Sequence, residues 1–246
     1  MRGVIRLSTA IVADQLTKEI GGEKIVNQLS FSVKKGEVFG LLGPNGAGKT
    51  MTIETLLGIK RPNKGSAKIL GLDPRKHRRE VFEKVGVQLQ SSSYQNNIRV
   101  GELCREIASL YKQPRDHQEL LTLFKLEKFQ TQYVEKLSGG ERQKLSIVLA
   151  LIPDPEIIFL DELTTGLDTE ARRNVWQTLI KLKETNLTIF LTTHYMEEAE
   201  ILCDRIYLIK RGSIVAEGTV PELLAESSQK NLEDAYLWFV GEGDYE

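Results

Sequence analysis

The residues with the clearest chemical pattern run from Gly43 to Thr50, in the order Gly-Pro-Asn-Gly-Ala-Gly-Lys-Thr. This order fits the pattern G-x-x-x-x-G-K-[ST], which wraps around phosphate groups when a strand precedes it and a helix follows. Glycines let backbone N–H groups turn toward the phosphates, because no Cβ atom blocks their approach. The sequence therefore predicts a binding site for a nucleoside triphosphate.

Lys49 and Thr50 complete this phosphate loop. We expect the Lys49 ammonium to contact the β- and γ-phosphates, and the Thr50 hydroxyl to ligate a Mg²⁺ ion on the same phosphates. The residues after the loop fit a helix, and the positive end of its dipole also favours an anion. A glycine-rich surface turn with an exposed lysine is the alternative, but the apolar run Val38–Leu42 and the helical pattern on either side favour the phosphate site.

A second chemical pattern is the acid pair Asp161 and Glu162, which follows the apolar run Ile157–Leu160. Open α/β sheets bind their ligands at the carboxyl ends of such strands. Beside a phosphate loop, the first acid is expected to hold Mg²⁺, and the second could act as a general base on water. Two solvated acids at a strand end are the alternative, and the presence of Lys49 weakens it.

The third pattern is Leu137–Gln143, which contains Ser138, Gly139, Gly140 and Glu141. Ser138 and Glu141 fit a capping box at the start of a helix. Two glycines at a helix N-terminus also leave N–H groups open to an anion. The capping box, which is a structural role, and anion binding, which is a functional one, are compatible in this segment.

The elements that must position these residues alternate along the chain. Apolar strands separated by helical patterns predict a parallel sheet with right-handed crossovers. Short strands around Gly21-Gly22 predict a hairpin or meander near the N-terminus, and residues from about 91 to 152 fit a helical insertion. A further helix is predicted to start at Asp73 and Pro74, with Asp73 as its N-cap. The predicted fold class is α/β, a phosphate-loop NTPase with a parallel core sheet, an N-terminal antiparallel β subdomain and an inserted α-helical subdomain.

Composition restricts the function further. The chain has 246 residues, 41% of them hydrophobic, and a formal net charge of −1. This balance gives no general attraction to nucleic acid. The two cysteines, Cys104 and Cys203, are too few for a disulfide framework and fit a reducing, cytoplasmic setting. No apolar run approaches the roughly 18 to 20 residues of a membrane span, so we expect membrane association only through a partner.

Together and in this order, the three patterns resemble those of the ATPase subunit of an ATP-binding cassette (ABC) transporter. The resemblance extends from about residue 11 to residue 224, and the Leu137–Gln143 signature is specific to ABC ATPases among phosphate-loop proteins. In that family two domains pair head to tail, and each ATP lies between one phosphate loop and the other subunit's signature. The resemblance implies ATP and Mg²⁺ as cofactors, and a second ATPase subunit and a transmembrane permease as partners. It also implies a location on the inner face of the cell membrane.

The resemblance also assigns individual residues. Gln90 resembles the glutamine that contacts Mg²⁺ and water and moves with the transporter interface, although Gln88 lies only two residues away. His194 resembles the switch histidine that senses the γ-phosphate, so the implied catalytic residues are Glu162, His194 and Gln90. The implied metal ligands are Thr50, Gln90 and Asp161. The implied nucleotide contacts are Gly43, Pro44, Asn45, Gly46, Ala47, Gly48, Lys49, Thr50, Met51, Ser138, Gly139, Gly140, Glu141 and Asp168.

Three positions depart from the family pattern. Ile20 stands where an aromatic ring often stacks on adenine, and we expect the loss of about 0.5 to 1.5 kcal/mol there unless another ring substitutes. Met51 replaces a second threonine, and Leu163 replaces a proline after the acid pair. None of the three removes a group that performs hydrolysis.

The predicted organisation is an ABC ATPase domain at 1–225 and a C-terminal helical tail at 226–246. The predicted function is ATP hydrolysis that energises a membrane transporter through ATP-driven dimerisation, with a weak similarity to the multidrug or polysaccharide export branch. Two alternatives remain open. One is a soluble ABC ATPase without a transport role, for example in iron–sulfur cluster assembly, and the other is a module that binds ATP only to dimerise.

Overall fold

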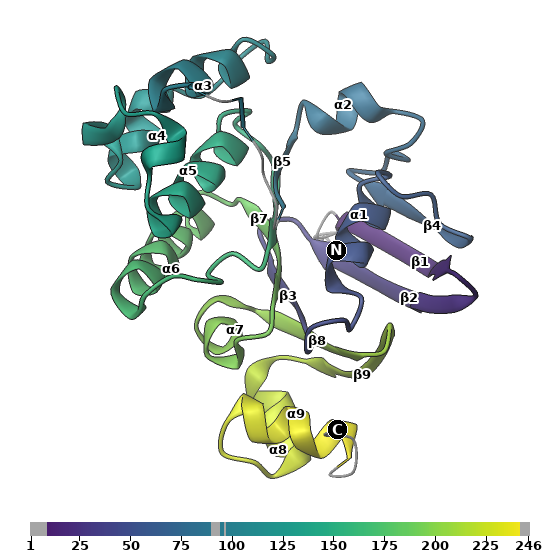
Figure 1. Cartoon of the computed structure of the whole chain (residues 1–246). Helices are drawn as coiled ribbons and strands as arrows, with labels where there is room; N and C mark the ends of the chain where they lie inside the picture. Colours follow the sequence, from purple (N-terminus) through teal and green to yellow (C-terminus); the bar gives the residue numbers. More distant parts are fainter. Residues whose placement is uncertain (1–8, 90–93, 96, 242–246) are drawn as a thin grey trace, which may run out of the picture.

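The centre of the molecule is a six-stranded sheet (Figure 1), seen in a computed structural model that describes residues 9–89, 94–95 and 97–241. Its strand order is β5-β6-β7-β3-β8-β9. All neighbouring strands are parallel except β8 and β9, which form an antiparallel pair. This arrangement confirms the predicted parallel core. The strands are Val85–Gln88 (β5), Ile157–Asp161 (β6), Thr188–Thr193 (β7), Val38–Leu42 (β3), Arg205–Lys210 (β8) and Ser213–Gly218 (β9).

A second sheet of three antiparallel strands lies beside the core, in the order β2-β1-β4. Its strands are Thr9–Ile20 (β1), Glu23–Lys34 (β2) and Lys64–Ile69 (β4). Gly21 and Gly22 form the turn between β1 and β2 with φ values of 59° and 86°, which a residue with a Cβ atom rarely adopts. The predicted antiparallel β subdomain is therefore present, with β4 as its third strand.

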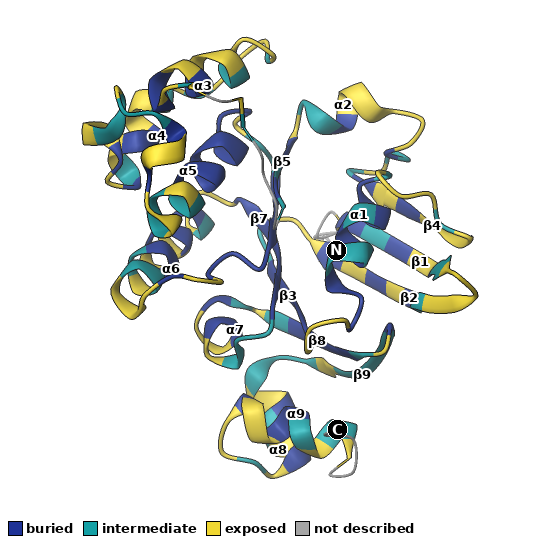
Figure 2. Cartoon of the chain, viewed as in Figure 1, coloured by how far each residue is buried: buried dark blue, intermediate teal, exposed yellow. Residues whose placement is uncertain are grey.

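The core strands separate two hydrophobic layers because successive side chains point to opposite faces of a sheet. In β6, Ile158 and Leu160 pack with the layer that contains α5 (Gly139–Leu151) and α6 (Thr169–Lys183). Ile157 and Phe159 pack in the other layer, with α1 (Lys49–Leu56) and the antiparallel sheet. Figure 2 shows the central strands as the buried middle of the molecule. The helix after the phosphate loop and the helix after the signature thus lie on opposite faces.

The helices between β5 and β6 form the predicted helical insertion. They are α3 (Val100–Ala108), α4 (His117–Leu123), the 3₁₀ turns η1 (Glu127–Phe129) and η2 (Val134–Lys136), and α5. Cys104 lies on α3 without solvent exposure, and burial raises the pKa of its thiol to about 12. Such a thiol takes part in packing and not in chemistry at neutral pH.

The C-terminal helices form a third hydrophobic cluster with β8, and the last two of these helices lie below β8 and β9 in Figure 1. They are α7 (Met196–Leu202), α8 (Val220–Ser227) and α9 (Leu232–Val240). On α9, the residues Leu232, Ala235 and Tyr236 are buried. The predicted boundary between 225 and 226 falls inside α8, which packs with α9. Within the described part of the chain, no helix is both long and apolar enough to cross a membrane.

The helix predicted to start at Asp73 is wrong. Asp73 instead accepts hydrogen bonds from the Arg75 backbone N–H at 3.0 Å and from the Arg75 guanidinium. The N–H groups of Lys76 and His77 both bond to the Asp73 carbonyl, which closes a turn. Aspartate often competes with helix formation in this way, and helix α2 begins only at Arg78 and ends at Phe82.

Candidate functional site

The phosphate loop connects β3 to α1 and is fixed at both ends by backbone hydrogen bonds. The Gly43 N–H bonds to the Thr193 carbonyl, and the Ala47 carbonyl accepts the Gly212 N–H at 3.0 Å. Between these points, residues 44–46 are exposed. The loop therefore presents its middle to solvent while the β7 end and the β8–β9 turn hold its base.

Glycine is required at the end of this loop by close packing. Gly48 has a φ of 98°, and a Cβ atom placed there would lie 2.3 Å from the Ile25 carbonyl oxygen of β2. Gly46 also has a positive φ, 80°, but no atom lies within 4 Å of its Cβ position. Open space at Gly46 and backbone contact at Gly48 fit a cradle that accepts a ligand on one side only.

The Lys49 side chain lies inside the loop and contacts the acid pair. Its Nζ atom donates to the carbonyls of Gly43, at 2.8 Å, and Pro44, at 3.0 Å. It also lies 3.2 Å from Glu162 Oε1, and both side chains are buried, with 4% and 8% of their surface exposed. The fold thus brings together the lysine and the second acid, which are 113 residues apart in the sequence.

Asp161 ends β6 and is completely buried. Burial raises the pKa of its carboxyl, while the nearby Thr192 and Thr50 hydroxyls oppose that rise. Its Oδ1 accepts from Thr192, but Oδ2 is buried and has no hydrogen-bond partner among the described atoms. A buried carboxylate oxygen without a donor, beside a hydroxyl, is the donor set that a hard cation such as Mg²⁺ prefers. The residues present therefore fit the predicted metal.

Glu162 adopts a left-handed backbone conformation, with a φ of 50°. Its N–H is held by the Thr192 carbonyl at 3.0 Å and by the Thr192 hydroxyl at 3.2 Å. Non-glycine residues in this conformation cluster at functional sites, where surrounding contacts hold them. Thr192 therefore supports both acids. The sequence analysis missed it, although the polar pair Thr192-Thr193 at the end of an apolar strand was a signal.

His194 follows β7 directly and faces the same acid. Its Nδ1 atom lies 3.6 Å from Glu162 Oε1, and 26% of the side chain is exposed. The imidazole ring packs against Tyr195 with ring centroids 4.1 Å apart. A pocket of about 580 Å³ opens beside it, lined by Gly43, Pro44, His194, Tyr195, Met196, Glu197, Glu233, Tyr236 and Leu237. The structure thus groups His194 with Glu162 and the phosphate loop.

Gln90 lies outside the described residues, so its predicted contacts with metal and water stay predictions. Gln88, the other candidate, is buried and occupied. Its side-chain carbonyl accepts the Asp161 N–H at 3.2 Å, and its amide donates to the Leu89 carbonyl. Gln88 therefore ties β5 to β6 and is not available for a ligand, which favours Gln90 for the ligand role.

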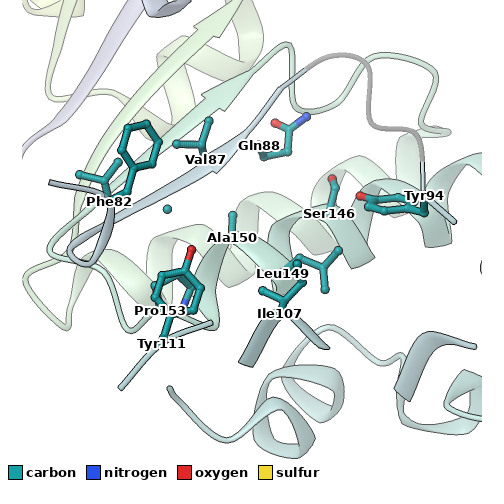
Figure 3. A pocket seen from close by; sticks show the side chains of 12 residues that line it. Phe82, Val87, Gln88, Tyr94, Ile107, Tyr111, Ser146, Leu149, Ala150 and Pro153 are labelled. Carbon is teal, nitrogen blue, oxygen red and sulfur yellow. The ribbon is translucent and has the colours of Figure 1, made fainter. Parts of the chain in front are cut away.

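Beside Gln88, a pocket of about 230 Å³ separates the core sheet from the helical insertion (Figure 3). Aromatic and apolar side chains from β5, α5 and the segments around them line it. Those labelled in Figure 3 are Phe82, Val87, Gln88, Tyr94, Ile107, Tyr111, Ser146, Leu149, Ala150 and Pro153. None of the phosphate-loop residues from Gly43 to Thr50 lines this pocket.

The signature residues lie apart from the phosphate loop of the same chain. Ser138 caps α5 by accepting the Glu141 N–H, and the Glu141 carboxylate accepts the Ser138 N–H at 2.8 Å. This confirms the predicted capping box. A Cβ atom on Gly140 would meet Leu167 at 3.4 Å, whereas the loop residues contact β2, β7 and β8. Ser138 and Gly139 are exposed and face no described residue of the loop.

Asp168, close to Gly140, has a local structural role. Its carboxylate accepts the Ala171 N–H at 2.8 Å and caps α6. The residue is exposed, as are Thr165 and Gly166 before it. The exposed residues Thr165, Gly166 and Asp168 therefore lie near the signature, on the side of the molecule that carries α5 and α6.

The three departures occupy different environments. Ile20 ends β1 with 51% of its surface exposed. Met51 packs against the hydrophobic layer under α1, and Leu163 is completely buried in the other layer. The Thr52 hydroxyl, one residue further, donates to the Gly48 carbonyl at 2.8 Å and is buried, so it does not replace the hydroxyl missing at Met51.

Comparison with known proteins identifies the family. A family model described as ABC transporter matches residues 26–165, more than half of the chain. The chain belongs to the ABC transporter family of ATPases. It is 41% identical over 215 residues to the Nod factor export ATP-binding protein I of Burkholderia orbicola (strain AU 1054), an alignment that covers 85% of this chain and 70% of the relative. The family match confirms the resemblance inferred from the three motifs.

A second ABC relative is longer. The probable multidrug ABC transporter ATP-binding protein YbhF of Escherichia coli (strain K12) is 34% identical over 248 residues. The alignment covers 97% of this chain but only 43% of YbhF, so the chain spans less than half of that relative. Both relatives are named as ATP-binding proteins, one of a multidrug ABC transporter and the other of Nod factor export.

Solved ABC structures share the fold. The ATP-binding subunit of an ABC transporter superposes with a TM-score of 0.86 and 24% identity, covering 95% of this chain and all of the other. An ATP-binding cassette solved as a dimer in a post-hydrolysis state with ADP and Pi gives a TM-score of 0.76 over 85% of this chain, at 24% identity. The predicted fold class is therefore confirmed.

Proposed function

We propose that this chain binds ATP with Mg²⁺ at the phosphate loop, hydrolyses it, and passes the resulting conformational change to a membrane permease. The observation that carries the proposal is the meeting of Lys49, Asp161 and Glu162 at the end of β6. The fold brings a phosphate-binding cation, a carboxylate fit for a metal and a second acid to one point. Phosphoryl transfer depends mainly on such positioning and on charge stabilisation.

The roles of the residues follow from their contacts. Backbone N–H groups of the loop and the Lys49 ammonium would bind the phosphates. Glu162 would accept a proton from the attacking water as general base, held in place by the backbone bonds to Thr192. His194, 3.6 Å from the same carboxylate, would donate a hydrogen bond to the γ-phosphate. Thr50 and Asp161, with Gln90, would hold the Mg²⁺ ion, which neutralises charge on the phosphate oxygens when bound.

We further propose that a second ATPase subunit completes each site. The exposed signature, with Ser138 and Gly140, does not contact the phosphate loop of its own chain, yet it presents a capped helix N-terminus fit for an anion. Head-to-tail pairing would place this end over the phosphates of the other subunit. Each site would then take the phosphate loop and the acid pair from one subunit and the signature from the other.

The permease is supported by the relatives and by one surface feature. The relatives are named for multidrug transport and Nod factor export, which favours an exporter over a cluster-assembly ATPase. The pocket of Figure 3 adjoins Gln88, two residues before the proposed metal ligand Gln90. Its aromatic lining suits apolar side chains of a membrane subunit, at the inner face of the membrane.

A capture experiment tests the transport role. The tagged chain is bound to detergent-solubilised membranes of its source cells with ATP, and a Lys49→Ala chain serves as the nucleotide-site control. We expect recovery of a polytopic membrane protein whose presence increases the ATPase rate of the chain. Recovery of soluble partners alone, with no rate increase in membranes, would contradict the transport role and leave the cluster-assembly alternative.

A further inference from the structure

Glu198 is a buried acid to which the proposed mechanism gives no role. It lies on α7, four residues after His194, and only 1% of its surface is exposed. Its Oε1 atom accepts a hydrogen bond from the indole Nε1 of Trp176 on α6 at 3.0 Å. Its Oε2 atom is buried and lacks a hydrogen-bond partner in the described part of the chain. An acid in such a place is costly to bury, so its contacts need an explanation.

The neighbours of this carboxyl come from both halves of the site. Burial raises the pKa of Glu198, and the side chains of Thr193, Trp176 and Thr164 oppose that rise. Thr193 precedes His194 in the chain, and Thr164 follows Glu162 by two residues. The carboxyl group therefore lies between the segment that carries the histidine and the segment that runs from the acid pair to Asp168.

A second contact joins the same two segments. The Arg172 guanidinium lies 4.6 Å from the centre of the Tyr195 ring, and that ring packs on His194. Arg172 is on the first turn of α6, the helix that Asp168 caps. Together with the bond between Trp176 and Glu198, this contact attaches the first half of α6 to two residues that follow His194, Tyr195 and Glu198.

We infer that Glu198 is a positioning residue, which through Trp176 holds His194 at a fixed place relative to α6 and its cap, Asp168. This inference rests on the proposed role of His194 as the phosphate-sensing histidine. Because α6 begins at the surface proposed to face a second subunit, Glu198 would link the histidine of one subunit to the surface that its partner contacts. Its effect on hydrolysis is therefore transmitted through His194 and not through substrate contact.

Two substitutions separate positioning from packing. Glu198→Gln keeps the side-chain shape and a carbonyl acceptor for the Trp176 N–H, whereas Glu198→Ala leaves that N–H buried and unpaired. We expect kcat to fall about 10-fold or more in the alanine variant and about 3-fold or less in the glutamine variant, with KM for ATP within about 2-fold in both. Glu37→Ala is the matched control, since only 9% of the Glu37 side chain is exposed and its carboxylate pairs with Arg205 at the end of β3 opposite the phosphate loop. It should lower thermal stability and leave kcat unchanged.

A double-mutant cycle tests whether the effect passes through His194. In a His194→Ala background, Glu198→Ala should cause little further loss of kcat, because the group that it positions is absent. The same fold-loss in both backgrounds would overturn the inference, and so would a KM increase that matches the kcat loss. An undiminished kcat in the single His194→Ala variant would instead contradict the proposed role of His194.

Tryptophan fluorescence gives a reading that does not depend on turnover. The chain has two tryptophans, and Trp238, which is half exposed, can be changed to phenylalanine so that Trp176 alone reports. We expect ATP with Mg²⁺ to change the Trp176 emission in this variant. The same change should persist when Glu198→Gln is added and disappear when Glu198→Ala is added. The inference would be overturned if the Trp176 emission does not respond to nucleotide, or if it responds equally with glutamate, glutamine and alanine at position 198. Either result would count against the inference even if His194 proves essential.

Discussion

Lys49 Nζ lies 3.2 Å from Glu162 Oε1, in a setting where both side chains are almost completely buried. The residue proposed to bind phosphate and the residue proposed to activate water therefore contact each other directly. A γ-phosphate that reaches Lys49 brings negative charge next to the carboxylate, and like charges at this distance in a buried site repel strongly. With the proposed roles, phosphate binding to Lys49 would therefore also free the Glu162 carboxylate to accept a proton from water.

Glu162→Gln should separate binding from hydrolysis. Glutamine keeps the size of the side chain but cannot accept a proton as a base, so turnover should fall about 100-fold or more. ATP affinity should stay the same or rise, because the amide no longer competes with phosphate for Lys49. ATPase assays and size-exclusion chromatography with ATP should show an inactive, ATP-bound dimer. An unchanged steady-state rate would exclude Glu162 as the base.

Lys49→Ala should weaken nucleotide binding itself. A charge-assisted hydrogen bond contributes about 1.5 to 3 kcal/mol, so the Kd for ATP should rise about 10- to 100-fold. A fluorescent-nucleotide titration measures this directly. Lys60→Ala, at an exposed lysine after α1, is the control and should bind as the unmodified chain does. Equal affinities for the two variants would contradict the phosphate role of Lys49.

Gly48→Ala should destabilise the fold more than Gly46→Ala. Both positions have a positive φ, and forcing alanine into that conformation costs about 1 kcal/mol. Only at Gly48 would the new methyl group also meet a backbone atom, 2.3 Å away at Ile25. Thermal unfolding without nucleotide should therefore show a clearly lower Tm for Gly48→Ala. Equal Tm values for the two variants would mean that β2 does not pack on the loop as described.

Ser138→Ala should damage the site of the partner and leave its own nucleotide binding intact. The loss of the cap should cost the helix about 1 kcal/mol, and Thr219→Ala removes the equivalent cap of α8, away from the site. In a Glu162→Gln background, Ser138→Ala should bind ATP as a monomer but fail to dimerise, whereas Thr219→Ala should still dimerise. Dimerisation in both would show that the signature does not contribute across the interface.

Glu156 should make the stability of the core sensitive to acid. Hydrogen bonds from Lys35 and Lys84 hold the pKa of its carboxyl below the usual 4.5. A group whose pKa is lowered by folding stabilises the protein above its unfolded pKa, and this contribution is lost as pH falls through the folded value. Glu156→Gln should therefore be less stable than the unmodified chain at pH 7, and the difference should shrink below about pH 4.5. Thermal unfolding of both proteins at several pH values measures this difference.

The sequence was most informative where the chemistry is contiguous. The phosphate loop, the acid pair and the capping box each lie within a few neighbouring residues, so their spacing alone predicted their surroundings. The contact between Lys49 and Glu162 was implied only by the expectation that the acid pair ends a strand beside the phosphate loop. Asp73 shows the opposite case, because a local side-chain turn overrode a helix start that looked equally plausible from residue types.

Other contacts could not be predicted because they depend on how distant strands align. Thr192 reaches Asp161 only because β6 and β7 are parallel and in register, with Asp161 opposite Thr192. Glu198 reads as an ordinary acid on a helix until the packing of α6 on α7 places Trp176 beside it. Neither contact can be predicted from a single sequence, because threonines in strands and glutamates in helices are frequent and carry no mark of their partners.

Lys49 donates hydrogen bonds to the carbonyls of Gly43 and Pro44, and these bonds also bear on the thermodynamics of nucleotide binding. With the bonds from Gly212 and to Thr193, they give the phosphate loop its shape through the protein's own contacts. Ordering a loop on binding has an entropic cost and adds to the heat-capacity change, and a preorganised loop avoids both. Calorimetry of nucleotide binding to the monomer should therefore show only a small heat-capacity change, from desolvation of the nucleotide and its pocket. The large heat-capacity change should come from dimerisation.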